Sequence, residues 1–306
     1  MSRAFLLTAL LSSALSLDAA TYYVATNGND VWTGTLPAPN AAKTDGPFAS
    51  LEKARDAVRV ERKTAAASPK ASTVEVREGV YALSKTLAFE PADSGTSNAP
   101  VTFKAFGKEH PTLIGGKPLT GFTQHQGQIL KTDTASQGLK GVYFRQLLFD
   151  GRRQHLARYP NFDASNPYGG GWAYADGKPV PMYQDIPGES KREFQYKTTD
   201  ARKWANPKEG QIFVFARYNW WNNIVNIASV DPATRKITLT GDASYPIRPT
   251  DRYFVQNLLE ELDAPGEWYL DKQTGTLYFW PPAPLNGRPV YAPTLRTIVE
   301  FRPGTS

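Results

Sequence analysis

The sequence predicts an all-β protein that starts as a parallel β-helix behind one capping helix and continues as a unit of antiparallel strands. Three observations lead to this prediction. Short apolar segments recur at a steady spacing between residues 73 and 116, only one segment has a helical pattern, and after residue 121 the strand patterns are joined by tight turns.

The first twenty residues have the features of a secretory signal peptide. Arg3 precedes an uncharged, mostly apolar run, Ala4–Leu17, and Ala19 and Ala20 supply small residues near a cleavage point. As a helix this run would reach only about 21 Å, short of the roughly 30 Å of a bilayer core. We therefore expect residues 1–20 to be a signal peptide, no membrane anchor, and a secreted or periplasmic bacterial protein.

The composition is that of an exported globular protein without disulfides. The 306 residues are 41% hydrophobic and 21% charged and include no cysteine, which excludes thiol catalysis and thiolate metal sites. The net charge is +6, but the basic residues are dispersed, so we expect no nucleic-acid partner. Dispersed positive charge is typical of a solvated surface, and it is also compatible with attraction of an acidic polysaccharide.

One helix is expected between residues 50 and 63. Leu51, Ala54 and Val58 form one apolar stripe, and Ser50 is a good N-cap, which explains its place in a Ser-x-x-Lys match better than nucleophilic catalysis does. We expect this helix to cover the first, otherwise unpaired edge of the β-helix. The polar residues predicted to face outward are Glu52, Lys53, Arg55, Asp56 and Arg59.

Four strand patterns follow the helix. They lie at Thr73–Gly79, Lys85–Pro91, Pro100–Gly107 and Pro111–Gly116, and turn residues separate each pair. Short, evenly spaced strands suit a sandwich or the coils of a parallel β-helix. Because each strand has a single strongly apolar centre and only a short turn before the next, the pattern favours the β-helix.

Residues 121–290 are predicted to form a second, all-antiparallel β unit. Asp150-Gly151 separates two apolar runs and indicates a hairpin, whereas Pro167–Gly188 is rich in glycine and proline and indicates a loop. The stretch Gly210–Gly241 reads as further strands. A second hairpin is expected around a turn at Asp271–Gly275.

Four carboxylates just before that hairpin resemble a catalytic pair at first sight. Glycosidases use two carboxylates about 5 to 10 Å apart, one of them kept protonated. Along an extended chain Glu261 and Asp263 share a face while Glu260 points away, and nothing local to these residues or to Glu267 predicts a selectively raised pKa. We therefore interpret this segment as scaffold.

The run Arg217–Asn226 combines aromatic rings with amides, the residue types that recognise sugars. In a strand, its two tryptophans would point to opposite faces, so that one could pack in the core while the other stays free. The candidate substrate-binding residues are Arg217, Tyr218, Trp220, Trp221, Asn222 and Asn223. The three histidines show no metal-ligand spacing and no phosphate loop is present, so we expect neither metal nor cofactor.

Several phrases of the sequence together resemble a known family. They are TYYVATNGND, GPFASLEKARDAVR, VEVREGVYALSKTLAF, SNAPVTFKAFG, FRQLLFDGRRQHLARYPN and LEELDAPGEWYLDKQTGTLYFWPP. They resemble the N-terminal half of secreted right-handed parallel β-helix glycoside hydrolases, most closely family 141 and more distantly the family 120 xylosidases.

The resemblance implies a specific organisation. Residues 21–120 would be the first β-helix coils with the capping helix, 121–290 an antiparallel β-sandwich-like insertion that interrupts them, and 291–306 the re-entry into the β-helix. The family's catalytic carboxylates lie on later coils, so the catalytic residues of this chain are unknown. The implied protein is an exported N-terminal part of a glycosidase that hydrolyses cell-wall polysaccharide or oligosaccharide.

Two other functions remain open at this point. One is a polysaccharide lyase on the same fold, and the other is a non-catalytic glycan-binding or adhesive module. A last expectation concerns association: if the β-helix ends open, Ile298, Val299 and Phe301 would be exposed, and the chain would aggregate or pair with another chain.

Overall fold

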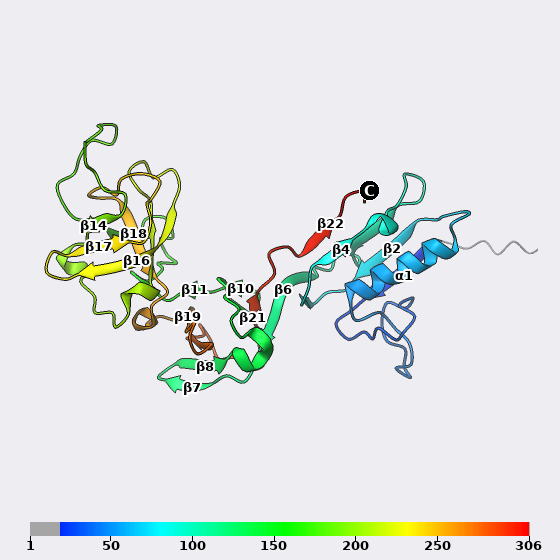
Figure 1. Cartoon of the computed structure of the whole chain (residues 1–306). Helices are drawn as coiled ribbons and strands as arrows, with labels where there is room; N and C mark the ends of the chain where they lie inside the picture. The colour runs from blue at the N-terminus through cyan, green and yellow to red at the C-terminus, as the bar shows by residue number, and fades with distance from the viewer. Residues whose placement is uncertain (1–18, 306) are drawn as a thin grey trace, which may run out of the picture. The chain divides into compact units, whose positions relative to one another are not determined.

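The computed structural model describes residues 19–305, which form two compact units (Figure 1). Unit 1 contains residues up to Gly115 together with the segment from Leu295, and unit 2 is Gly116–Thr294. The predicted signal peptide lies almost entirely outside the described residues. Within the described range, no helix has the length and apolar character needed to cross a membrane.

Unit 1 consists of one long helix and short strands. The helices are α1 (Leu51–Thr64) and the 3-10 turn η1 (Pro91–Asp93). The strands are β1 (Ala20–Val24), β2 (Ser72–Val76), β3 (Val80–Leu83), β4 (Leu87–Phe89), β5 (Val101–Ala105), the first half of β6 (Thr112–Leu119) and β22 (Val299–Phe301). This confirms that the chain is mostly strand, with the single helix starting one residue after the predicted cap.

The strands of unit 1 pair in parallel. The first sheet has the order β1-β2-β5, with Val24 beside Val76 and Val76 beside Ala105. The start of β6 pairs with β3, and β22 pairs with β4, which places Phe301 beside Phe89. Along the chain, β2, β3 and β4 are therefore each extended by one later strand: β5, β6 and β22.

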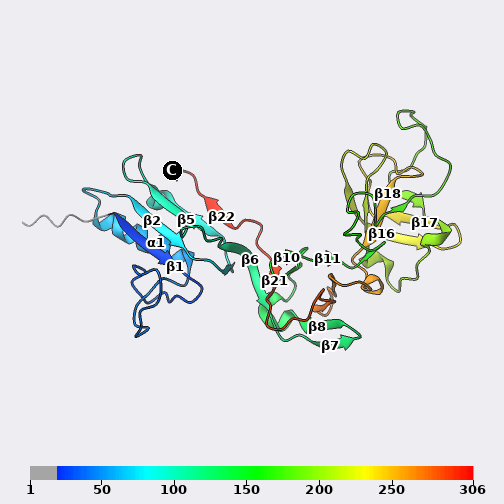
Figure 2. The ribbon, with the colours of Figure 1, turned by 180° about the vertical axis from the view of Figure 1, so that it is seen from behind.

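Helix α1 lies against β1 and β2 of this strand layer (Figure 2). Leu51, Ala54 and Val58 are buried in one cluster with Val24 and Val74, as their spacing predicts. Burying each large aliphatic side chain contributes roughly 1.5–3 kcal/mol, so the stripe is the main attachment of the helix.

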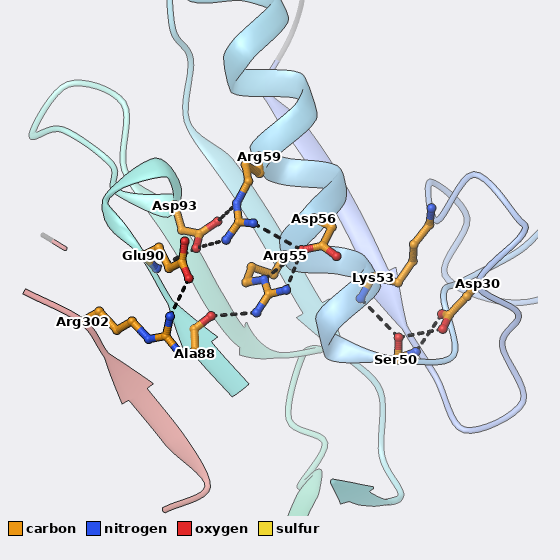
Figure 3. Close-up of polar contacts among 10 residues, drawn as sticks. All are labelled: Asp30, Ser50, Lys53, Arg55, Asp56, Arg59, Ala88, Glu90, Asp93 and Arg302. Carbon is orange, nitrogen blue, oxygen red and sulfur yellow. Dashed lines mark hydrogen bonds and ion pairs between the residues drawn. The ribbon is translucent and has the colours of Figure 1, made fainter. Parts of the chain in front are cut away.

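The helix's arginines do not simply face solvent, contrary to the sequence expectation. Arg55 donates from Nη1 to the carbonyl of Ala88 in β4 at 2.7 Å, and Arg59 holds Asp93 through bonds of 2.8 and 2.6 Å (Figure 3). One turn further, Arg62 donates to the carbonyls of Lys70 and Ala99. Guanidinium groups reach polar atoms beyond the apolar stripe, and the bond from Arg55 satisfies a backbone acceptor of β4 that no strand of the described residues binds on that side.

Ser50 caps the helix as predicted. Its hydroxyl accepts the backbone N–H of Lys53 at 3.2 Å and donates to the Asp30 carboxylate at 2.7 Å. The same carboxylate accepts the backbone N–H of Ser50 (Figure 3) and also that of Ala49. The hydroxyl is thus fully engaged in capping. The side chain of Lys53 does not approach this hydroxyl but lies over the ring of Phe48.

Unit 2 contains the remaining elements. Its short helical turns are η2 (Ala135–Leu139), η3 (Thr198–Asp200), η4 (Pro207–Glu209) and η5 (Leu259–Glu261). Its strands, besides the second half of β6, are β7 (Thr123–Gln126), β8 (Ile129–Asp133), β9 (Leu148–Phe149), β10 (Arg152–Arg153), β11 (His155–Leu156), β12 (Arg158–Tyr159), β13 (Ala173–Tyr174), β14 (Glu193–Gln195), β15 (Gln211–Val214), β16 (Asn223–Asp231), β17 (Lys236–Leu239), β18 (Arg252–Gln256), β19 (Glu267–Leu270), β20 (Thr276–Phe279) and β21 (Val290–Pro293).

The largest sheet of unit 2 has the strand order β12-β18-β15-β16-β17-β14, with β13 also paired to β18. Burial alternates along β15: Ile212 and Val214 are fully buried, while Phe213 between them points to the other face. Tyr253 and Val255 of β18 share the buried side with Ile212 and Val214, in one apolar cluster. The sheet therefore has a closed apolar face and a second face available for other contacts.

Two predicted hairpins are confirmed. Asp150 and Gly151 both have positive φ and connect β9 to β10, and Gly275, at φ +75°, closes the turn between β19 and β20. The unit is not all-antiparallel as expected, because β11 pairs in parallel with β19, placing His155 beside Glu267. Sequence periodicity identifies strands but carries no information about partners so distant in the chain.

We expect Asp93→Ala to destabilise unit 1 by about 1–3 kcal/mol, because it leaves the buried N–H of Glu90 without an acceptor and removes the partner of Arg59. Burial alone would raise the pKa of Asp93, yet the bonds from Arg59 and Glu90 hold it below its ordinary value. Urea unfolding of the whole chain measures the change. Asp56→Ala, which removes an exposed partner of Arg55, is the control and should cost no more than about 0.5 kcal/mol. Equal losses in both variants would contradict this role of Asp93.

Candidate glycan-binding site

An exposed cluster of aromatic rings lies beside the connection between β15 and β16. We define the aromatic platform as the rings of Tyr183, Tyr218, Trp220, Trp221 and Tyr245. The two tryptophans are 63% and 51% exposed, which is far more than indole rings in a core. Large apolar rings held at the surface in a group are typical of a binding surface.

The rings of the platform support one another. Tyr218 stacks on Trp220 with centroids 4.7 Å apart, and Trp221 stacks on Tyr245 at 5.8 Å. Tyr245 also meets the ring of Tyr218 edge-on at 4.9 Å and packs against the core of the large sheet. Through Tyr245 the exposed indoles are connected to the core of the large sheet, so that their ring faces are oriented before a ligand binds.

The backbone below the platform is held by a buried carboxylate. Asp251 accepts the N–H groups of Arg217 and Arg248 through Oδ2, both at 2.7 Å. Arg217 and Asn219 have positive φ, a conformation that turns the chain out of the strand. Burial raises the pKa of Asp251 to about 6, since desolvation outweighs the two backbone donors.

Arg217, the arginine among the candidate binding residues, holds a neighbouring loop in place. Its Nε donates to the carbonyl of Met182 at 2.9 Å, and its Nη2 pairs with Asp185 at 2.7 Å. The guanidinium also lies 4.6 Å from the ring centroid of Tyr218. Arg217 thus connects the loop that carries Tyr183 to the platform, and its charge is already partnered.

The structure brings Tyr218, Trp220 and Trp221 together but corrects the reason given for them. These residues lie in a turn, not in a strand, so both indoles are exposed, whereas strand alternation predicted one buried and one free. Asn223 starts β16 and bonds Ser244 through both its amide atoms, and Asn222 is exposed beside the rings. An amide therefore remains next to the platform.

Sequence reasoning missed Tyr183, Tyr245 and Asp251. Tyr183 comes from the glycine- and proline-rich loop, and Tyr245 from the connection after β17, so neither is near the tryptophans in the chain. The only sequence signal for them is the presence of exposed aromatic residues among turn-forming ones.

The carboxylates at residues 260–267 serve the scaffold, as interpreted from the sequence. Glu261 is buried and binds the guanidinium of Arg202 and the indole N–H of Trp204, while Glu260 accepts the N–H of Ala205 at 2.7 Å. The segment is not extended, because η5 turns the chain here. Glu261 and Asp263 nevertheless both reach the guanidinium of Arg202, so the two carboxylates lie on the same side of the chain.

The expectation that no carboxylate here has a raised pKa is wrong. Glu267 is 2% exposed, and burial raises its pKa to about 8, although it accepts backbone N–H groups of Asp263, Ala264 and Arg158. The sequence shows only a glutamate at the start of a strand. Its burial follows from strand β11, which covers β19 from more than a hundred residues away in the chain.

Across residues 19–305, no group of three or more histidine, aspartate or glutamate side chains is arranged to hold a metal ion. The groups that the platform offers a ligand are ring faces and amides.

Comparison with known proteins supports the fold. No protein-family model matches the chain, and no curated protein is similar to it at a significant level. Among solved structures, a chain described as "Glycoside hydrolase" aligns with 92% of this chain at a TM-score of 0.67 and 21% identity. A second, described as "The complex structure of XylC with xylose", aligns with 91% of the chain at a TM-score of only 0.28 and 15% identity.

The first likeness shows that this chain has the fold of the matched part of that glycoside hydrolase. The chain spans about half of it, since the alignment covers 47% of the longer protein.

We expect Glu267→Gln to reduce the loss of stability at alkaline pH. Because the folded pKa of about 8 lies above the ordinary value of 4.5, the stabilising contribution is complete below pH 4.5 and is lost as the pH rises through about 8. Glutamine has a similar shape and does not titrate, so the difference in unfolding free energy between pH 5 and pH 9 should shrink by a few kcal/mol, on the order of what such a shift implies.

Urea unfolding at the two pH values tests this. Glu260→Gln makes the same chemical change at an exposed position and should keep the wild-type pH dependence. The same pH dependence in Glu267→Gln and wild type would refute the assignment of the titration to Glu267.

Proposed function

We propose that this chain is an exported carbohydrate-active protein that forms the N-terminal part of a glycosidase hydrolysing cell-wall polysaccharide or oligosaccharide. The observation that carries the proposal is the fold shared with a glycoside hydrolase over 92% of this chain. About half of that protein lies outside the matched part, which is compatible with our proposal that the catalytic carboxylates are in coils beyond this chain. Export is proposed from the signal-like residues 1–20, and no cofactor is proposed.

The right-handed parallel β-helix is part of the same proposal. It is supported by the parallel pairing of three successive strands, β2, β3 and β4, with three later strands, β5, β6 and β22. In a β-helix each coil repeats the strands of the coil before it, so this order is what two successive coils would produce. Unit 2 would then be the insertion within the second coil, after β6.

The aromatic platform supports contact with a glycan. A pyranose ring has one apolar face, which stacks on an indole, and hydroxyls that bond a neighbouring amide such as that of Asn222. The platform's rings are already stacked on one another, so binding would cost little side-chain entropy.

We expect Trp220→Ala and Trp221→Ala each to weaken binding of a neutral glycan about tenfold. Covering about 50 Å² of ring face contributes about 1.3 kcal/mol, which corresponds to roughly that factor. Titration calorimetry with the best ligand from a glycan panel measures the loss. Tyr168→Ala removes another ring of unit 2, 86% exposed and outside the platform, and should bind like wild type. Full affinity in both tryptophan variants would exclude the platform as the glycan site.

A non-catalytic glycan-binding module is the second candidate function. It is favoured by a specific observation: the platform is exposed, whereas Glu260, Glu261 and Glu267 are engaged in structural bonds. Binding that depends on Trp220 and Trp221, without release of reducing sugar by the chain together with its full-length continuation, would favour this alternative.

We also propose that unit 1 can pair with another chain. Phe301 is 70% exposed and Val299 37% exposed, and together with Phe103 and Leu113 they line an apolar hollow of about 410 Å³. Apolar surface beside strand edges favours addition of further strands.

We expect Phe301→Lys to reduce self-association, because a charged side chain would have to be desolvated in the contact. Analytical ultracentrifugation over a concentration series should show a dissociation constant raised at least about tenfold. Val31→Lys changes a still more exposed apolar residue of the same unit, outside the hollow, and should leave association unchanged. A wild-type chain that is monomeric at all concentrations would rule out this pairing.

A further inference from the structure

A pocket in unit 2, which shares no residue with the aromatic platform, lies on the face of the large sheet opposite its core. Phe213 and Phe254 form its floor, stacked with centroids 4.5 Å apart. The pocket measures about 380 Å³, within the range of pockets that hold small ligands. The side chains around it come from Arg145, Arg153, His155 and Phe162.

The charged side chains that line this pocket are all basic. Three arginines and one histidine line it, and no aspartate or glutamate does. Arg145 and Arg153 are exposed and make no side-chain hydrogen bond or ion pair within residues 19–305. Most other surface arginines of this unit, such as Arg202 and Arg235, are paired with a carboxylate.

The third arginine is fixed in place without a charge partner. Arg158 is 7% exposed, donates from Nε to the carbonyl of Pro160 at 2.8 Å and to the carbonyl of Gly171, and lies 3.6 Å from the ring centroid of Phe254. Its nearest acidic neighbour is Glu267, and with a pKa of about 8 that group is mostly neutral at neutral pH. The positive charge below the pocket is therefore uncompensated.

His155 is affected by the same positive charges, and its ring adds an aromatic surface to the pocket. Burial lowers the pKa of His155, and the charges of Arg158 and Arg153 lower it further. A neutral imidazole stacks on Phe162 with centroids 4.3 Å apart, and Phe162 is itself 39% exposed. The pocket thus offers aromatic faces beside two free guanidinium groups.

We propose that this pocket binds an acidic saccharide unit, with the sugar ring on the aromatic surface and its carboxylate or sulfate at Arg145 and Arg153. Guanidinium groups bind planar or tetrahedral anions through paired hydrogen bonds, and Arg158 adds a fixed positive field beneath. The proposal rests on the proposed function only in that the ligand is a saccharide. It extends that function by naming anionic glycans as a ligand class, and the anion site is argued from the pocket alone.

The test is titration calorimetry of the whole chain with tetragalacturonic acid, a sulfated tetrasaccharide and neutral xylotetraose. The double variant Arg145→Gln/Arg153→Gln should lose at least tenfold in affinity for the acidic ligand that binds. Its affinity for the neutral ligand should stay unchanged. Lys178→Gln/Lys203→Gln removes two exposed, unpartnered charges of the same unit outside the pocket and is the matched control. Binding of the carboxylated or of the sulfated ligand alone identifies the anion.

Three results would overturn the proposal. The first is the absence of a binding signal with either acidic tetrasaccharide, and the second is binding by the arginine variant that equals that of the lysine variant. The third is full displacement of the saccharide by inorganic sulfate at equal concentration, which would make this a simple anion site. Failure of the proposed function gives a different result. If the chain does not bind neutral glycans at the platform but still binds an acidic saccharide through its arginines, the platform is excluded as a glycan site and the proposal for the pocket stands.

Discussion

The structure of unit 1 depends on satisfying the open edge of its parallel strands. Helix α1 does this in two ways, because its apolar stripe buries Leu51, Ala54 and Val58 while its arginines reach over the stripe to backbone carbonyls and Asp93. Of these arginines, Arg55 bonds a strand carbonyl, that of Ala88 in β4, whereas Arg59 binds a carboxylate and Arg62 binds carbonyls that lie outside the strands. The helix is therefore attached to the strand layer by apolar packing and by hydrogen bonds from its arginines.

In unit 2 the two faces of the large sheet have different roles. Along β15 and β18, Ile212, Val214, Tyr253 and Val255 point into the core, and Phe213 and Phe254 stack on the other side. The core face stabilises the unit, and the phenylalanine face is left to support Arg158 and the pocket above it. The aromatic platform depends instead on a turn held by Asp251. Recognition surfaces thus form where strand regularity stops or where its second face is not covered.

Local patterns predicted much of this fold. The stripe of α1, its Ser50 cap and the turns at Asp150-Gly151 and Gly275 each follow from residues close together in the chain. Long-range pairing did not follow, because the partners of β11 and β22 cannot be read from periodicity. For the site, composition identified the tryptophans, but assuming a strand gave the wrong exposure for one of them. The burial of Glu267 and the convergence of Tyr183 and Tyr245 required the tertiary structure.

The ends of unit 2 have a consequence for how such proteins can be rebuilt. Gly116 pairs with Pro293 in one ladder, and next to it the N–H of Leu295 donates to the carbonyl of Gly115 at 2.9 Å. A methyl group at Gly116 would lie 2.1 Å from the Ala292 carbonyl oxygen, so this close approach of entering and leaving chain requires glycine. A segment whose two ends lie close together can be replaced or inserted without a change in the path of the remaining chain. Residues 116–294 are therefore a natural unit for excision or grafting, with Gly115 and Leu295 as the splice points.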